Sequence, residues 1–96
     1  MSDWEVYIIH FDPPYKHARH YTGISLNSQD RFIEHDNGTG GNLTRIAKNH
    51  GVKFILNVIA TGLSFYEAHA KEKLIKHKGS KIYCPICKQK GGENIA

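Results

Sequence analysis

The sequence contains few cysteines and no long apolar run, and both shortages exclude whole classes of protein. Its 96 residues include only two cysteines, Cys84 and Cys87, which are too few for the disulfide framework of a small secreted domain. No apolar stretch is long enough for a membrane-spanning helix or a signal sequence. We therefore expect a cytoplasmic protein without a membrane partner.

The charge excess is also small. Thirteen Lys and Arg stand against nine Asp and Glu, which gives a net charge of +4 and a pI near 9.1. This balance permits a polyanionic partner without requiring one. No repeat or linker divides the chain, so we expect one globular domain over residues 1–88 and a flexible polar tail over 89–96.

The apolar pattern predicts a small mixed fold. Residues 4–11 are apolar on both faces, which is typical of a central strand, and Pro13 and Pro14 should end that strand. Ser28 is a plausible N-cap for the first helix, and the segment from Ser64 to Glu67 is a capping box that opens the longest helix. We expect strands over 4–11, 20–26 and 52–61, and helices over 29–37, from Leu43 to His50, and to about Lys78. The fold class is therefore α+β, with a three-stranded antiparallel β-sheet flanked by about three helices.

Three charged side chains on the predicted helices have two interpretations each. Glu72 lies at the edge of a packing face, where it either pairs with Lys76 four residues later or ligates a hard cation. Arg31 and His35 share one helix face. In one interpretation Arg31 reaches solvent and His35 interacts with the C-terminus of its own helix. In the other, they form a cationic pair that binds phosphate.

The segment "YCPICK" has the spacing of half a zinc site at Cys84 and Cys87. Closing such a site needs two more ligands, and His77, His69 and His50 are the nearby candidates by sequence. Because no second CxxC or spaced histidine pair follows, the sequence favours two reduced, partly buried thiols over structural Zn²⁺.

Taken in order, these segments resemble the GIY-YIG nuclease family over residues 4 to about 85. "EVYII" corresponds to the first motif of the family, and "YTG", from Tyr21 to Gly23, to the second. "DRFIEH" corresponds to its arginine helix, and "EAHAKEKLIK" to the late helix with a metal-binding glutamate. The site residues carried by these motifs are Tyr7, Tyr21, Arg31, His35 and Glu72.

The resemblance implies hydrolysis of DNA phosphodiesters, with RNA also open as a substrate, by a Mg²⁺- or Mn²⁺-dependent endonuclease. Glu72 would hold the metal, Tyr7 would act on the attacking water, and Tyr21 would position the phosphate. Arg31 would stabilise the transition-state charge, and His35 would carry a proton or donate to phosphate. No separate recognition domain is evident, so sequence specificity would be low or would come from a homodimer or a partner protein. The residues expected to contact the substrate are Gly23, Lys16 and Lys76.

The chain also departs from the family pattern. Glu5 replaces the glycine that opens the first motif, and the loop between the two tyrosine motifs is longer than usual. Cys84 follows Tyr83 where the family commonly has an asparagine, so that support is lost or replaced by thiol chemistry. Two other functions therefore stay open: a nucleic-acid-binding module of the same fold without turnover, and a small zinc-stabilised interaction domain built on "CPIC".

Overall fold

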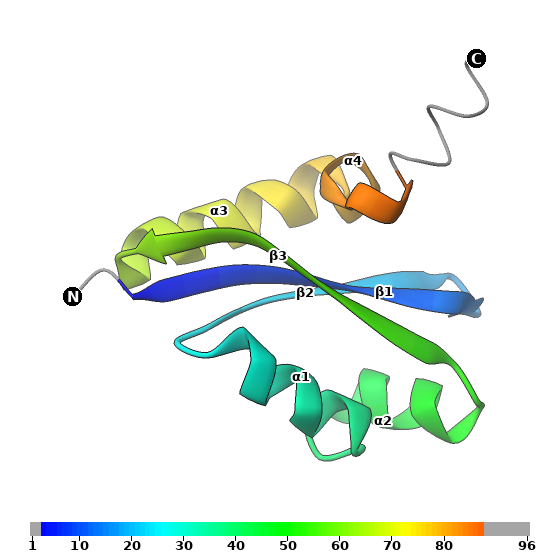
Figure 1. Ribbon diagram of the computed structural model, residues 1–96. Helices are drawn as coiled ribbons and strands as arrows, with labels where there is room; N and C mark the ends of the chain where they lie inside the picture. The colour runs from blue at the N-terminus through cyan, green and yellow to red at the C-terminus, as the bar shows by residue number, and fades with distance from the viewer. Residues whose placement is uncertain (1–2, 88–96) are drawn as a thin grey trace.

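The computed structural model describes residues 3–87 and confirms the α+β fold with a three-stranded antiparallel sheet. The strands run in the order β2-β1-β3, and helices cover both faces of the sheet (Figure 1). The elements are β1 (Trp4–Tyr15), β2 (Ala18–Ser25), α1 (Ser28–Asp36), α2 (Asn42–Asn49), β3 (Lys53–Leu63), α3 (Phe65–Lys78) and α4 (Ser80–Tyr83).

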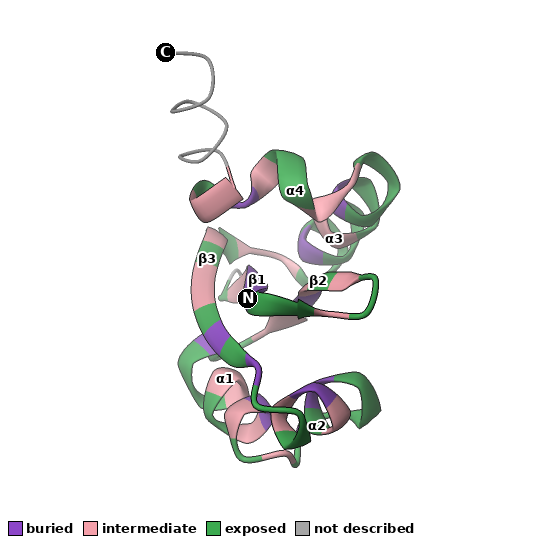
Figure 2. Ribbon diagram, turned by 90° about the vertical axis from the view of Figure 1, so that its right-hand side faces the viewer, coloured by how far each residue is buried: buried purple, intermediate pink, exposed green. Residues whose placement is uncertain are grey.

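The central strand β1 contributes to two separate cores. Its residues Tyr7 and Phe11 pack with Ala47 of α2 on one face, whereas Ile8 packs with Ile75 of α3 on the other. Successive side chains of a strand point to opposite faces, so one strand can supply both cores. Figure 2 shows the sheet as a thin layer between the α1/α2 layer and the α3/α4 layer. The expected burial of both faces of this strand is therefore confirmed.

The first strand is longer than predicted, because the two prolines do not end it. β1 pairs with β2 from Glu5 to His10, and the next pair is Tyr15 with Ala18. Between these pairs the register shifts, so Pro13 and Pro14 lie where no ladder N–H is required of them. The hairpin consequently extends beyond its expected end.

Irregular pairing also changes which face of the sheet the side chains of β3 occupy. Tyr7 pairs with Val58 while Val6 pairs with Ala60, so β3 carries one extra residue at this point. A one-residue shift moves the following side chains to the other face. Ala60 therefore joins the core beneath α3, whereas simple alternation along β3 would place Val58 and Ala60 on one face.

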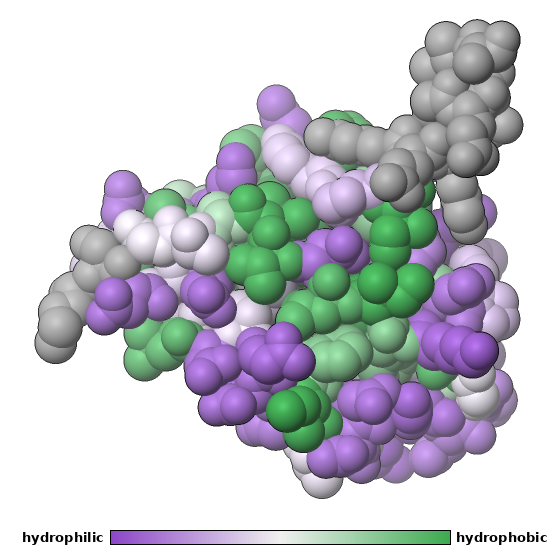
Figure 3. Space-filling view, viewed as in Figure 1, coloured by the Kyte–Doolittle hydropathy of each residue, from purple (hydrophilic) through white to green (hydrophobic). Residues whose placement is uncertain are grey.

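The β3 strand forms one edge of the sheet. Apolar side chains gather along the middle of the face drawn in Figure 3, and Ile55 and Val58 of β3 are 39% and 45% exposed. On α3, Ala68 and Ile75 are buried. Tyr66 of the same helix is 82% exposed.

The predicted helix ends are mostly confirmed. Ser64 and Glu67 form the capping box of α3, and Asn37 with Gly38 ends α1. The N-cap of α1 is Asn27 rather than Ser28, since the Asn27 side chain accepts the N–H of Asp30 at 3.1 Å. The polar tail predicted over 89–96 lies outside the described residues. Within residues 3–87, no helix is long and apolar enough to cross a bilayer.

Candidate functional site

The tyrosine of the first motif lies over the glycine of the second. Tyr7 on β1 pairs with Gly23 on β2, and a Cβ atom added at Gly23 would lie 2.6 Å from Tyr7 Oη. No side chain fits there, so Gly23 provides the space for the phenol to extend across the edge strand. The contact explains why a glycine stands at this position of "YTG" and places it beside Tyr7.

A buried chain of hydrogen bonds begins at the Tyr7 hydroxyl. Tyr7 Oη lies 3.2 Å from His35 Nε2, and His35 Nδ1 lies 2.8 Å from Thr44 Oγ1. The Thr44 hydroxyl also donates to the Gly41 carbonyl at 3.4 Å, so it accepts from the Nδ1–H of His35. The Nε2 atom then has a lone pair and accepts the Tyr7 O–H.

The pKa values of Tyr7 and His35 agree with this assignment. Burial, followed by the nearby Tyr21, raises the pKa of Tyr7 to about 12, although Arg31 opposes the shift. Burial and the charge of Arg31 hold the pKa of His35 below its usual value, with a smaller opposing effect of Glu34. At neutral pH the pair is therefore a protonated phenol beside an uncharged imidazole.

Arg31 and Tyr21 complete the tyrosine cluster, which we define as Tyr7, Tyr21, Arg31 and His35. The Tyr21 ring lies 4.6 Å from the His35 ring and 6.4 Å from the Tyr7 ring, between centroids. Arg31 donates to Glu34 at 3.1 Å and to the Gly40 carbonyl at 2.9 Å. These bonds hold the guanidinium in place while its side chain stays 36% exposed.

Electrostatics keep Arg31 charged. Burial would lower the pKa of Arg31, but Glu34 and Tyr7 raise it above its usual value. A fixed cation beside a neutral phenol and a neutral imidazole is an arrangement that can bind an oxyanion such as phosphate. The expected interaction of His35 with its own helix C-terminus is wrong, because the buried imidazole bonds Tyr7 and Thr44 instead.

Glu72 belongs to the other helical layer. Its carboxylate accepts from Lys76 at 3.3 Å and lies 3.6 Å from His69, and its side chain is only 16% exposed. The predicted pair with Lys76 is confirmed. The charge of Glu72 is also the smallest of the influences on the pKa of Tyr7, which it raises.

The two lysines expected at the substrate lie apart from the tyrosine cluster. Lys16 forms the hairpin turn with a φ of 54° and lies over the Tyr15 ring. It lies nine positions beyond Tyr7, which corresponds to roughly 30 Å along an extended strand. Lys76 is held by Glu72.

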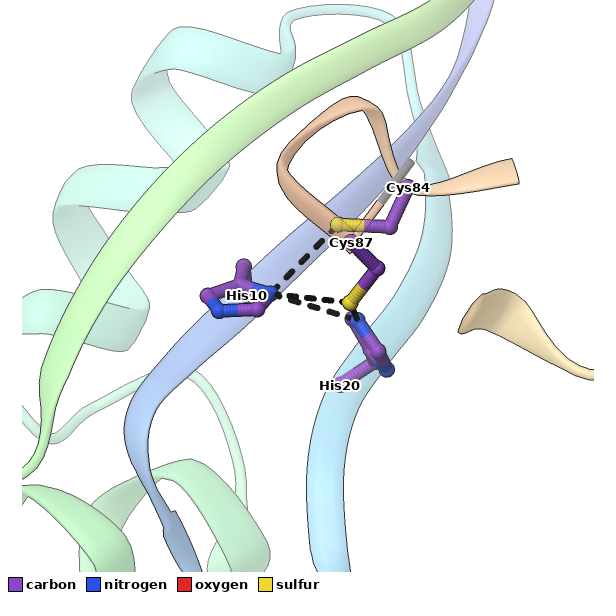
Figure 4. Close-up of side chains that lie close together, drawn as sticks. All are labelled: His10, His20, Cys84 and Cys87. Atoms are coloured by element: carbon purple, nitrogen blue, oxygen red, sulfur yellow. Dashed lines mark hydrogen bonds between the residues drawn. The ribbon is translucent and has the colours of Figure 1, made fainter. Parts of the chain in front are cut away.

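A second cluster lies on the α3/α4 face of the sheet and consists of His10, His20, Cys84 and Cys87. Each residue offers one ligand atom, and the four atoms lie within 4.8 Å of one another. Figure 4 shows the two imidazoles reaching from β1 and β2 toward the two sulfur atoms. This His₂Cys₂ cluster could hold a metal ion.

The cluster corrects the expected partners of the cysteines. His50 instead bonds the carbonyl of Ile46 at 2.9 Å, and His69 pairs with Glu72. His10 and His20 are ten residues apart, but they are direct partners across the hairpin. Their pairing was the missing signal, because it depends on a register that the irregular loop leaves open.

Cys84 therefore lies at a different site from the one that the asparagine of the GIY-YIG pattern supports. Its sulfur lies 3.4 Å from His10 Nδ1, on the face of β1 opposite to Tyr7. The Cys84 thiol therefore does not support the tyrosine cluster. Burial, followed by His10 and Arg19, lowers the pKa of His20, which keeps that imidazole in the uncharged form that metals bind.

Comparison with known proteins adds no assignment. Scans against protein-family models, curated proteins and solved structures each gave no significant match.

Proposed function

We propose that this chain is a metal-dependent endonuclease that hydrolyses DNA phosphodiester bonds through a GIY-YIG-type active site. The observation that carries the proposal is the hydrogen bond from Tyr7 Oη to His35 Nε2. It joins the tyrosine of the first motif to the histidine of the helix motif, and Tyr21 and Arg31 lie around it. Four residues from three sequence motifs therefore meet in one cluster.

In this proposal Tyr7 and His35 move one proton in relay. A phenol with a pKa of about 12 is a poor acid in water, so it needs a partner that accepts its proton as the reaction proceeds. The water oxygen bonds to phosphorus as the P–O bond to the leaving oxygen breaks, the water proton passes to Tyr7 Oη, and the Tyr7 proton passes to His35 Nε2. Thr44 holds the imidazole in the tautomer that this relay requires.

Arg31 and Tyr21 would bind the reacting phosphate. The Arg31 guanidinium is oriented by Glu34 and by the Gly40 carbonyl, so little side-chain entropy is lost when it meets the extra negative charge of the transition state. Tyr21 is partly exposed beside His35 and offers a hydroxyl to a phosphate oxygen.

The divalent cation of the proposal is Mg²⁺ or Mn²⁺ at Glu72. Mg²⁺ is commonly held by one or two carboxylates together with substrate phosphate, so a single carboxylate fits such a site. When bound, the cation neutralises phosphate charge and stabilises the leaving oxygen. The His₂Cys₂ cluster does not suit Mg²⁺ or Mn²⁺, because imidazole and thiolate ligands favour zinc.

A binding module without turnover is the second candidate. Glu72 is held by both Lys76 and His69, and these contacts would have to open before a cation could bind. If they do not open, the tyrosine cluster would bind nucleic acid through Arg31 without cleaving it.

Nicking of supercoiled plasmid with Mg²⁺ or Mn²⁺ tests the proposal. We expect wild-type protein to cut and Glu72→Gln to lose cleavage, because the amide cannot replace a charged metal ligand. The matched control is Asp36→Asn, which removes a surface carboxylate paired with Lys48 and should cut normally.

The two candidates separate in a binding assay. A protein that never cuts, but loses salt-dependent DNA binding on Arg31→Ala, would be the binding module. Cleavage that persists in Glu72→Gln would contradict the metal role of Glu72.

A further inference from the structure

We propose that His10, His20, Cys84 and Cys87 bind one structural zinc ion that fastens the C-terminal segment to the β1–β2 hairpin. The proposal is independent of the nuclease function, since it concerns the opposite face of the sheet. It rests on the convergence, spacing and chemistry of the four ligand atoms.

More neighbouring atoms converge on His10 Nδ1 than this nitrogen can hydrogen-bond. His10 Nδ1 lies 3.3 Å from His20 Nε2, 3.4 Å from Cys84 Sγ and 3.7 Å from Cys87 Sγ. One imidazole nitrogen has a single proton or a single lone pair in the ring plane. It cannot bond three neighbours at once, whereas one cation among the four atoms satisfies all of them.

Four of the six separations between the ligand atoms also match the edges of a zinc tetrahedron. Bonds of about 2.05 Å to nitrogen and about 2.3 Å to sulfur, at tetrahedral angles, separate two nitrogens by about 3.3 Å and a nitrogen from a sulfur by about 3.6 Å. The observed separations are 3.3 Å between the nitrogens of His10 and His20. They are 3.3, 3.4 and 3.7 Å between nitrogen and sulfur.

The ligand set identifies the ion. Two thiolates and two imidazoles in a tetrahedral arrangement are typical of structural zinc. A two-iron cluster with two cysteines and two histidines places its pairs on different irons, and ligand atoms this close leave room for only one ion. Four protein ligands also close the coordination shell, so this zinc would not bind substrate.

The ion would anchor a short segment to the sheet. α4 spans only Ser80–Tyr83, and a single helical turn is not stable alone. Its other attachments include a hydrogen bond of 2.6 Å between Ser80 Oγ and Thr22 Oγ1 and the partly buried Tyr83. Cys84 and Cys87 come directly after this turn, so zinc would join it to both strands of the hairpin and contribute folding free energy.

Metal analysis tests the site directly. Untagged protein, purified with a thiol reductant and supplied with zinc before dialysis, should retain about one zinc ion per chain. Cys84→Ser and His20→Gln should lose it. His77→Gln is the matched control, because it removes an exposed histidine that precedes the cysteines but lies outside the cluster, and it should keep its zinc.

Cobalt substitution keeps the test decisive if a variant fails to fold. Wild-type protein stripped of metal and titrated with Co²⁺ should develop intense visible bands and a thiolate charge-transfer band, the signature of tetrahedral coordination with sulfur. Zinc should then displace the cobalt. Wild-type protein that takes up neither ion, or zinc that remains bound in Cys84→Ser, would overturn the proposal. Neither readout depends on DNA cleavage.

Discussion

The two faces of the β1–β2 hairpin carry different chemistry from adjacent residues. Tyr21 faces α1 and α2, where it lies beside His35, whereas its neighbour His20 faces the two cysteines. Tyr7 and His10 divide in the same way on β1. Because side chains alternate along a strand, the hairpin can support a tyrosine cluster on one face and a metal cluster on the other.

The two clusters also differ in what holds them together. The tyrosine cluster consists of groups that satisfy one another by hydrogen bonds, from Thr44 through His35 to Tyr7. The His₂Cys₂ cluster brings four possible metal ligands together, an arrangement that a cation can stabilise. The first arrangement suits proton transfer and the second suits structural metal binding. Changes on one face should therefore leave the function of the other face intact.

The largest expected effect is on the tyrosine face. Tyr7→Phe removes the hydroxyl that bonds His35, so we expect the DNA cleavage rate to fall by about 100- to 10,000-fold, the usual contribution of proton transfer. Zinc content should not change. Tyr15→Phe, near the end of the same strand, is the control and should cleave normally. A Tyr7→Phe protein with wild-type cleavage would remove Tyr7 from the proposed mechanism.

The second effect belongs to the metal face. A ligand at 100 times its dissociation constant adds about 2.7 kcal/mol to stability, which corresponds to about 10–20 °C in Tm for a domain of this size. We expect a chelator to lower Tm by this amount in wild-type protein and restored zinc to reverse the change. Cys87→Ser should have the lower Tm from the start. A Tm that ignores both chelator and zinc would contradict a structural role.

A smaller effect concerns the contact between Gly23 and Tyr7. Gly23→Ala places a Cβ 2.6 Å from Tyr7 Oη, so the phenol must shift. We expect a loss of about 1–3 kcal/mol in unfolding free energy, as for other overpacked sites, together with weaker cleavage. Gly41→Ala is the control, because its Cβ would meet only Thr44 Oγ1 at 3.9 Å. Equal effects of the two changes in chemical denaturation would show that the contact does not matter.

The smallest effect is a pH dependence of stability from His35. Its folded pKa lies below the unfolded value of about 6.5, so on acidification the unfolded chain takes up a proton first. The contribution of His35 to the free energy of unfolding should therefore be fully present above pH 6.5. Below that pH it should decrease, by at most about 1.4 kcal/mol per pH unit. The titratable or charged groups that face His35 are Tyr7, Tyr21, Arg31 and Glu34.

His35→Asn isolates this contribution. His20 also has a lowered pKa and changes stability in the same direction, so the wild-type slope alone does not identify the residue. Denaturant titrations at several pH values should show that the unfolding free energy of the variant depends less steeply on pH than that of wild-type protein. Identical slopes would assign the pH dependence to other groups.

Much of the fold could be predicted because it depends on local rules. Apolar residues on both parities of β1 indicated a central strand, and Ser64 with Glu67 marked the start of α3. The boundary errors came from pairing. Pro13 and Pro14 lie inside β1 because the ladder to β2 is interrupted there, and no pattern in the prolines reveals that.

The residues of the two sites also differ in whether local sequence could predict them. Tyr7, Tyr21, Arg31 and His35 could be proposed from short motifs, since each motif supplies its residue type within a recognisable local segment. Cys84 and Cys87 were visible as half a metal site, but their expected partners were wrong.

The sequence by itself determined the elements and the residue types of the tyrosine cluster, because both depend on neighbours within one helical turn or one strand. Only the tertiary structure decided that His10 and His20 lie side by side and that a segment more than 60 residues later brings two thiols to them. The physical reason is that strand register and chain return are set by the packing of the whole domain, which no local pattern encodes.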